Sequence, residues 1–82
     1  MPRFYFDVSV GDDFNPDDTG FVYESLATAE YYAARTAAEI SQDVLPKRRA
    51  SEVSVQVRDG DGLLLFTVEL AMTVRRTARA VA

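Results

Sequence analysis

Two runs of alternating or apolar residues, joined by an Asp-Gly-Asp-Gly turn at residues 59–62, constrain the fold of this chain more than any other feature. Residues 52–58 read EVSVQVR, so that apolar and polar side chains alternate, and residues 63–66 resume with LLLF. Alternation with a period of two is typical of half-buried strands, and Asp-Gly pairs between two such runs favour a hairpin. The chain is therefore expected to contain an antiparallel hairpin in its second half.

The turn also predicts a register for this hairpin. A two-residue loop at Gly60 and Asp61 and a four-residue loop over residues 59–62 both pair residues whose numbers sum to 121, so the faces are the same in either case. Leu63 and Leu65 then lie on the face away from the helix, and residues 70–74 extend past the paired part of the hairpin. The side chains expected on the helix side are Val53, Val55, Val57, Leu64, Phe66 and Val68.

A second pair of strands is expected in the first quarter of the chain. Residues 3–10 alternate cleanly, which predicts a strand. Residues 11–20 are rich in turn formers and separate it from a short strand around residues 21–23, so the two should form a hairpin with a long loop. The side chains on the apolar face of the first strand are Phe4, Phe6, Val8 and Val10.

Between the two hairpins the spacing of apolar residues predicts one amphipathic helix. Ser25 is placed to cap its N-terminus, and Pro46 ends it near Leu45. Three or four residues separate the members of its apolar stripe, which are Leu26, Ala29, Ala33, Ala37, Ile40 and Val44. A stripe made mostly of alanine lets the helix axis approach a sheet closely.

Together these elements predict an α+β domain of order β-β-α-β-β, with a four-stranded antiparallel sheet and one helix packed on one face. Strand order two-one-three-four keeps all neighbouring strands antiparallel and leaves the fourth strand at an edge. A chain of 82 residues makes one domain at most, which we place at residues 1–74. Residues 75–82 are expected to form a flexible basic tail.

The composition excludes several kinds of chemistry. The chain has no histidine and no cysteine, so it lacks the usual general base near neutral pH, a thiolate nucleophile and the common zinc ligands. No glycine-rich loop precedes the N-terminus of a helix, as a phosphate site would require. We therefore expect no enzymatic activity, no catalytic residue and no cofactor.

The ends and the hydropathy of the chain point to a cytoplasmic protein. Asp7 interrupts the N-terminal segment before a signal-peptide apolar core could form. No run approaches the roughly 20 apolar residues of a membrane span, so no membrane association is expected.

The acidic loop contains a partial calcium-loop pattern. Its candidate metal ligands, at positions one, three, five and twelve of that pattern, are Asp13, Asn15, Asp17 and Glu24. The sixth position, which requires glycine, is Asp18, and Pro16 stiffens the loop. A solvated hairpin loop without a metal is therefore the favoured interpretation.

The apolar residues that the monomer leaves uncovered predict an interface with a partner. An exposed edge strand invites pairing with another chain, so we expect a homodimer formed through the last strand, with a second protein at the same edge as the other option. The predicted interface residues are Leu63, Leu65, Leu70, Met72 and Val74.

Nucleic-acid binding is the alternative function, and it depends on two basic segments. The net charge is −4, but residues 1–70 carry −7 and the last twelve residues +3, so the acidic body repels phosphate backbones. Contacts would come from Lys47, Arg48, Arg49, Arg75, Arg76 and Arg79. A regulatory, antitoxin-like subunit is the form that fold analogy suggests for this alternative.

Over nearly its whole length the chain resembles a small bacterial family of unknown function that is common in alphaproteobacteria. The matching parts are the start MPRFYFD at residues 1–7, the acidic loop closing with DDTG at residues 17–20, the alanine-rich helix at residues 26–40, and VQVRDGDG at residues 55–62. Gly60 stands where the family is expected to have a longer polar residue, which affects only the turn type. The resemblance implies the same fold class and a bacterial cytoplasmic origin, and it implies no activity.

Overall fold

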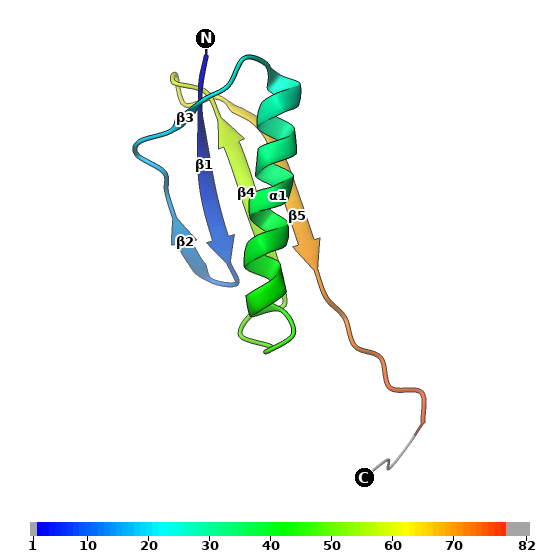
Figure 1. Ribbon diagram of the computed structural model, residues 1–82. Coiled ribbons are helices and arrows are strands. Elements are labelled where there is room, and N and C mark those ends of the chain that lie inside the picture. The colour runs from blue at the N-terminus through cyan, green and yellow to red at the C-terminus, as the bar shows by residue number, and fades with distance from the viewer. Residues whose placement is uncertain (1, 79–82) are drawn as a thin grey trace.

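A computed structural model describes residues 2–78 of the chain and confirms the α+β class and the predicted order of elements (Figure 1). The strands that the sequence predicted are present, and the loop after the first of them contains one additional short strand. In chain order the elements are β1 (Arg3–Val10), β2 (Asp13–Asn15), β3 (Phe21–Val22), α1 (Leu26–Val44), β4 (Glu52–Arg58) and β5 (Leu64–Ala71).

The sheet is antiparallel, with the order β2-β1-β4-β5 and with β3 paired to the same edge of β1 as β2. The predicted order therefore holds, with the additional strand β2 lying beside the predicted second strand, β3, along the outer edge of β1. β2 pairs with the end of β1, where Val8 lies opposite Asn15. β3 pairs with its beginning, where Phe4 lies opposite Phe21. Between these two pairings, three residues of β1 have no strand partner on that side in the described part of the chain.

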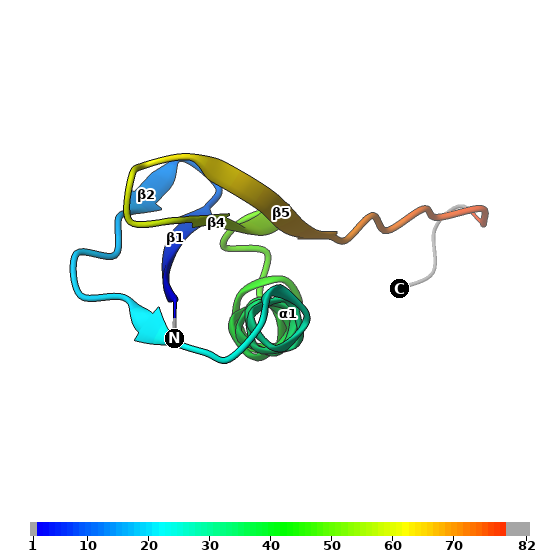
Figure 2. The ribbon, with the colours of Figure 1, turned by 90° about the horizontal axis from the view of Figure 1, so that it is seen from above.

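Helix α1 covers one face of the sheet and leaves the other open (Figure 2). The Ser25 hydroxyl accepts a hydrogen bond from the backbone N–H of Thr28, so the predicted N-cap is confirmed. The helix ends at Val44, with Leu45 as its C-cap residue. Within the predicted stripe, Leu26 is wrongly placed, because its side chain at the first turn is half exposed.

The core is built mainly by the sheet, since the helix contributes only small side chains to it. The fully buried helix residues are Ala29, Ala33 and Ala37. They face Phe4 and Phe6 of β1 and the valines of β4. The largest fully buried side chains of the described chain are Val53, Val55 and Val57. Phe66 and Val68 of β5 pack against the same cluster, so α1 lies over β4 and β5.

The predicted register of the β4–β5 hairpin is wrong by two residues. Val57 pairs with Phe66 and Val55 with Val68, because the turn is a three-residue loop followed by an irregularity in the ladder beyond Arg58. The loop closes through hydrogen bonds of 2.9 Å from Asp59 N to the Leu63 carbonyl and 3.1 Å from Gly62 N to the Asp59 carbonyl. Gly62 has a φ of 86°, which suits glycine at the end of such a loop.

The extra residue in the ladder exchanges the positions of two leucines. Leu64 was expected against the helix, but it pairs opposite Arg58 and is half exposed. Leu65 was expected on the open face, but it packs against the core. A shift of two residues preserves faces, so Phe66 and Val68 remain on the helix side as predicted.

The same shift changes the end of β5. Leu70 pairs with Val53, and the N–H of Met72 donates to the Ser51 carbonyl at 3.1 Å. The prediction that the strand is unpaired from residue 70 onward is therefore wrong, and the paired part reaches residue 72. Residues 73–78 then leave the domain as an extension (Figure 1). In the part of the chain that the structure describes, no helix is long and apolar enough to cross a membrane.

Candidate functional site

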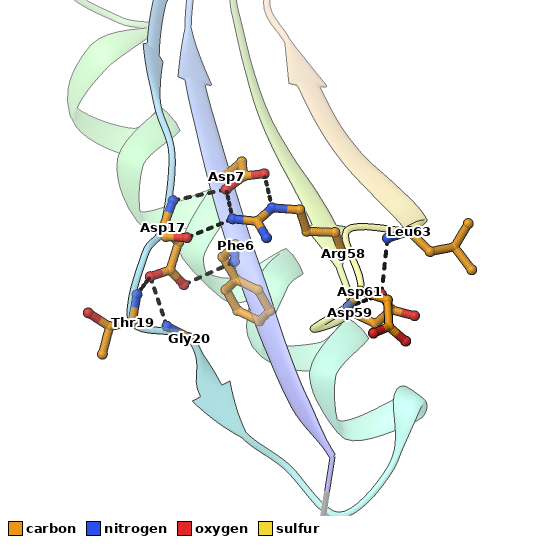
Figure 3. A network of polar contacts seen from close by, with 9 residues as sticks. All are labelled: Phe6, Asp7, Asp17, Thr19, Gly20, Arg58, Asp59, Asp61 and Leu63. Atoms are coloured by element: carbon orange, nitrogen blue, oxygen red, sulfur yellow. Dashed lines mark hydrogen bonds and ion pairs between the residues drawn. The ribbon is translucent and has the colours of Figure 1, made fainter.

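The gap between β2 and β3 along the edge of β1 is filled by a side chain. The backbone N–H of Phe6 points toward this gap and donates to Asp17 Oδ2 at 3.1 Å (Figure 3). An unpaired backbone donor at a partly buried position costs free energy comparable to a lost hydrogen bond. The Asp17 carboxylate therefore takes the place of the strand partner that β1 lacks there.

Asp17 also organises the loop that carries it. Its Oδ1 accepts hydrogen bonds of 3.0 Å from the backbone N–H groups of Thr19 and Gly20. Burial by itself would raise the pKa of Asp17, but the hydrogen bonds from Gly20, Phe6 and Thr19 and the charge of Arg58 outweigh it, so the pKa lies below its ordinary value.

Glycine is required at the end of this loop for two reasons. Gly20 has a φ of 77°, which strains any other residue. A Cβ at this position would also lie 2.9 Å from the side chains of Arg3 and Tyr5. The DDTG sequence at residues 17–20 is therefore explained by the local structure.

An ion pair between neighbouring central strands holds this loop against the sheet. Asp7 of β1 is buried, and its Oδ2 accepts from Arg58 Nε of β4 at 2.8 Å. Asp7 Oδ1 accepts from the backbone N–H of Asp17 at 2.9 Å, and Arg58 Nη2 donates to the Asp17 carbonyl at 2.8 Å. Arg58 also lies over the ring of Tyr5, 4.7 Å from its centroid. We call Asp7, Asp17 and Arg58 the polar lock (Figure 3).

The polar lock is suited to holding the structure together rather than to acid–base chemistry. A general acid near neutral pH needs a carboxyl whose pKa is raised, whereas the pKa of Asp17 is lowered. The Asp7 carboxylate is already engaged by two donors of Arg58 and one backbone N–H. Both carboxylates therefore serve as acceptors within the fold.

The lowered pKa of Asp17 predicts a pH dependence of stability. Because the folded pKa lies below the unfolded value of about 3.9, ionised Asp17 stabilises the fold above that value, and this contribution is lost as the pH falls through the folded pKa. The free energy of unfolding of the wild type should exceed that of Asp17→Asn by about 1–2 kcal/mol at pH 7. This difference should become smaller below about pH 4. Urea unfolding from pH 7 to pH 3 measures both values.

Asp18→Asn is the matched control for this pH series. Asp18 is the exposed neighbour of Asp17, and its Oδ1 accepts only a 3.3 Å hydrogen bond from the Thr19 hydroxyl among the described residues. Its substitution should change the free energy of unfolding by less than about 0.5 kcal/mol at either pH. If the difference in the free energy of unfolding between wild type and Asp17→Asn stayed constant down to pH 3, the stabilising role of the ionised Asp17 carboxylate would be contradicted.

The candidate calcium ligands are distributed over separate elements. Asp13 and Asn15 lie in β2, Asp17 is engaged by backbone N–H groups, and Glu24 lies next to the N-cap of α1. Within residues 2–78, no three acidic side chains gather in a way that could hold a metal ion.

The two basic segments lie near the same end of the molecule. Arg48 and Val74 line a common groove of about 280 Å³, between the loop after α1 and the start of the extension. Lys47 forms an exposed ion pair with Asp43 at 3.0 Å, and the N–H of Arg49 donates to the Val44 carbonyl. Arg75 and Arg76 are exposed on the extension, whereas Arg79 lies outside the described residues. Binding of nucleic acid here stays a prediction.

The predicted interface residues occupy different environments. Leu63 is 63% exposed in the turn, and Leu65 packs against the core. Leu70 is partly exposed at the end of β5, and Val74 is exposed on the extension. Met72 is half-buried and lines the groove. The structure thus brings Met72 and Val74 together and separates them from Leu63.

Within residues 2–78, the outer edge of β5 has no strand partner and presents unpaired backbone groups. In an antiparallel pair, residues that exchange both hydrogen bonds alternate with residues that exchange none. The bond from Met72 to Ser51 marks the even-numbered residues of β5 as those bonded to β4. The odd-numbered residues therefore direct their N–H and C=O groups away from β4. On the regular part of the strand these are Thr67, Glu69 and Ala71.

The two edges of the sheet differ in how well they are protected. On the β1 side, β2 and β3 are only three and two residues long, and the segment between them contains Pro16 and Asp17 of the polar lock. Short strands and proline are common devices against edge-to-edge pairing. β5 is eight residues long and carries no proline, no lysine and one charged residue, Glu69.

Sequence reasoning missed the polar lock, although signals for it were present. Alternation placed Asp7 on the open face, where a carboxylate is ordinary, and its burial depends on how the distant loop folds. Asp17 was considered only as a metal ligand. The signals were Asp7 and Arg58 on the same face of two predicted strands, and the Asp-x-x-Gly turn that begins at Asp17. Together they could have suggested an ion pair between strands.

Comparison with known proteins yields one family. No curated protein and no solved structure matches the chain. A family model described as a domain of unknown function, DUF6894, matches residues 3–71. This range begins with the first residue of β1 and ends with the last residue of β5. The matched range coincides with the α+β domain described above, and the chain therefore belongs to the DUF6894 family.

Proposed function

We propose that the protein is a non-catalytic interaction module that self-associates through the outer edge of β5. The observation that carries this proposal is the contrast between the two edges of the sheet. The β1 edge is closed by short strands, Pro16 and the polar lock, whereas eight residues of β5 have no strand partner on their outer side among the described residues.

Backbone pairing is the contact that this edge can make. The outward groups of Thr67, Glu69 and Ala71 belong to exposed residues, so an incoming strand meets no covering side chains. Addition of a strand to an exposed edge derives its affinity mainly from main-chain hydrogen bonds. A non-catalytic role is supported by the absence of histidine and cysteine and by the engagement of both polar-lock carboxylates within the fold.

Thr67→Pro should convert a dimer into a monomer. The N–H of Thr67 points away from β4, so proline removes an outward donor and blocks an incoming strand while the β4–β5 bonds persist. The dissociation constant should rise more than about tenfold, because two-fold symmetry applies the loss twice. Size exclusion coupled to light scattering should give twice the mass of one chain for wild type and the mass of one chain for the variant.

Two controls separate this result from a loss of structure. Circular dichroism should show that Thr67→Pro retains the fold. Gln56→Lys and Thr67→Lys place the same charge on the open face, because these two residues are paired, but only Thr67 lies on the edge strand. The lysine at residue 67 should weaken the dimer and the lysine at residue 56 should not. A wild-type mass of one chain at high protein concentration would reject self-association.

A further inference from the structure

We propose that two copies pair their β5 strands in one particular register, in which Thr67 of each copy lies opposite Glu69 of the other. In this register Arg75 on the extension of each copy meets Asp61 in the hairpin turn of the other. The inference rests on the proposed self-association and adds to it the alignment and a pair of charged contacts.

Backbone geometry restricts the registers that are open to two antiparallel β5 strands. Only the odd-numbered residues direct hydrogen-bonding groups outward, so odd-numbered residues must face odd-numbered residues. Two such registers are centred on the strand: one places Thr67 against its own copy, and the other places Thr67 against Glu69. The next register along places Glu69 against its own copy, and like charges directly opposite one another are destabilising.

The irregularity near the turn distinguishes the two central registers. The irregularity lies at Leu65, which has no partner in β4 between the pairs formed by Leu64 and Phe66. Aligning Thr67 with its own copy continues the pairing through this irregularity, with Leu64 opposite residue 70 of the other copy. Aligning Thr67 with Glu69 places Leu65 in the last pair, opposite residue 71, so the irregularity stays at the end of the ladder. It also places the Thr67 hydroxyl next to the Glu69 carboxylate, which can accept a hydrogen bond from it.

Charge favours the same choice. The extension leaves the domain in the direction of β5, so in an antiparallel dimer it runs beside the turn of the other copy (Figure 1). Six residues beyond the Thr67–Glu69 pair, Arg75 of one copy lies opposite Asp61, whose side chain is exposed. In the competing register Arg75 lies two residues further along, past the tip of the turn, because the chain reverses between Asp59 and Leu63.

These contacts also reduce a repulsion. Residues 1–70 carry a net charge of −7, so two copies joined at β5 bring two acidic bodies together. Arg75 and Arg76 of each copy are then placed over the acidic turn of the other. Because of the two-fold symmetry each contact occurs twice, which makes the assembly sensitive to salt.

The helices leave room for this arrangement. Pairing β5 with its copy about an axis perpendicular to the sheet places both helices on the same face. Each helix lies over β4 and β5 of its own copy, because its alanines share a core with Val55 of β4 and Phe66 of β5. Two to three strand spacings, about 10–14 Å in total, then separate the two helix axes. This is no shorter than the roughly 8–10 Å at which helices pack, so the helices do not overlap.

A cross-linking experiment tests the register directly, because the chain contains no cysteine. Directly opposite residues of a bonded pair have Cα atoms about 5.5 Å apart, which a disulfide can span, whereas positions offset by two residues exceed its limit of about 7 Å. A mixture of Thr67→Cys and Glu69→Cys proteins should therefore form the mixed disulfide under mild oxidation. Each variant alone should cross-link poorly, and Gln56→Cys, one strand inward, should not cross-link.

The outcomes distinguish the register from self-association itself. A disulfide of Thr67→Cys with itself would overturn the proposed register while leaving the β5 dimer intact. A dimer that light scattering detects but that neither cysteine position can cross-link would place the interface elsewhere and overturn both proposals. A wild-type monomer would overturn both as well.

Charge reversal tests the contact between the extension and the turn. Asp61→Arg and Arg75→Asp should each weaken the dimer by about fivefold at low salt, and the double variant should recover most of the affinity. Reversal at Asp12, an exposed acid in the β1–β2 turn, serves as the matched control for net charge and should leave the dissociation constant unchanged. Equal effects of Asp61→Arg and Asp12→Arg would show that only total charge matters and would reject the contact.

Discussion

Replacing Asp7 with alanine should lower the free energy of unfolding by about 2–3 kcal/mol, a large fraction of the roughly 4–12 kcal/mol available to a domain of this length. The Asp7 carboxylate is buried and joins Arg58 to the backbone of Asp17. Without it, a partly buried guanidinium loses its ion-pair partner and the loop loses its attachment to β1. Urea unfolding followed by circular dichroism measures the change.

Two further variants make this prediction specific. Asp7→Asn should also be destabilising, because every partner of the carboxylate is a donor and the new NH₂ group must face one of them. Asp18→Ala removes an exposed carboxylate from the same loop and should change the free energy of unfolding by less than about 0.5 kcal/mol. If Asp7→Ala were as mild as Asp18→Ala, the polar lock would not support the fold.

Replacing Ala33 with leucine should cost about 2–3 kcal/mol. Ala33 is fully buried between the helix and the sheet, where the core already contains Phe6, Val55 and Val57. Three added carbon atoms at this point force the helix away from the valines of β4 or push side chains out of their preferred rotamers. Both responses reduce the packing that holds the layers together, and the loss is measured by urea unfolding.

Ala34 provides the matched control for this overpacking. It follows Ala33 in the helix, and its side chain is exposed. Leucine and alanine both favour helices, so Ala34→Leu should change the free energy of unfolding by less than about 0.5 kcal/mol. If the two leucine variants were equally stable, a small side chain at residue 33 would not be required for the close packing of the helix on the sheet.

The fold was predictable where a single period governs several residues. Spacings of three and four gave the helix and its alanine face, and alternation gave the buried valines of β4. Even with the wrong loop length, Phe66 and Val68 were assigned to the correct face, because the error of two residues equals the period of a strand. Patterns repeated over many residues are thus robust to local error.

The rest depended on individual side-chain hydrogen bonds, which have no period. Asp59 Oδ1 accepts from Asp61 N and Leu63 N, which supports a three-residue loop where the spacing allowed two or four. The burial of Asp7 likewise requires the loop around Asp17 to fold over it. The predicted interface residues of β5 lie in other environments than expected for the same reason, because the loop length sets the register of β5 against β4.

The central pairing of β1 with β4 has a consequence for the order of folding. In the chain, β1 precedes the helix and β4 follows it, although the two strands are neighbours in the sheet. The Asp7–Arg58 pair joins residues 51 positions apart. Closing so long a loop costs entropy before any of its contacts form, which slows folding. On the ribosome, Phe4 and Phe6 should remain without their β4 partners until residues 52–58 have emerged, so the domain should complete its core only after β4 has been synthesised.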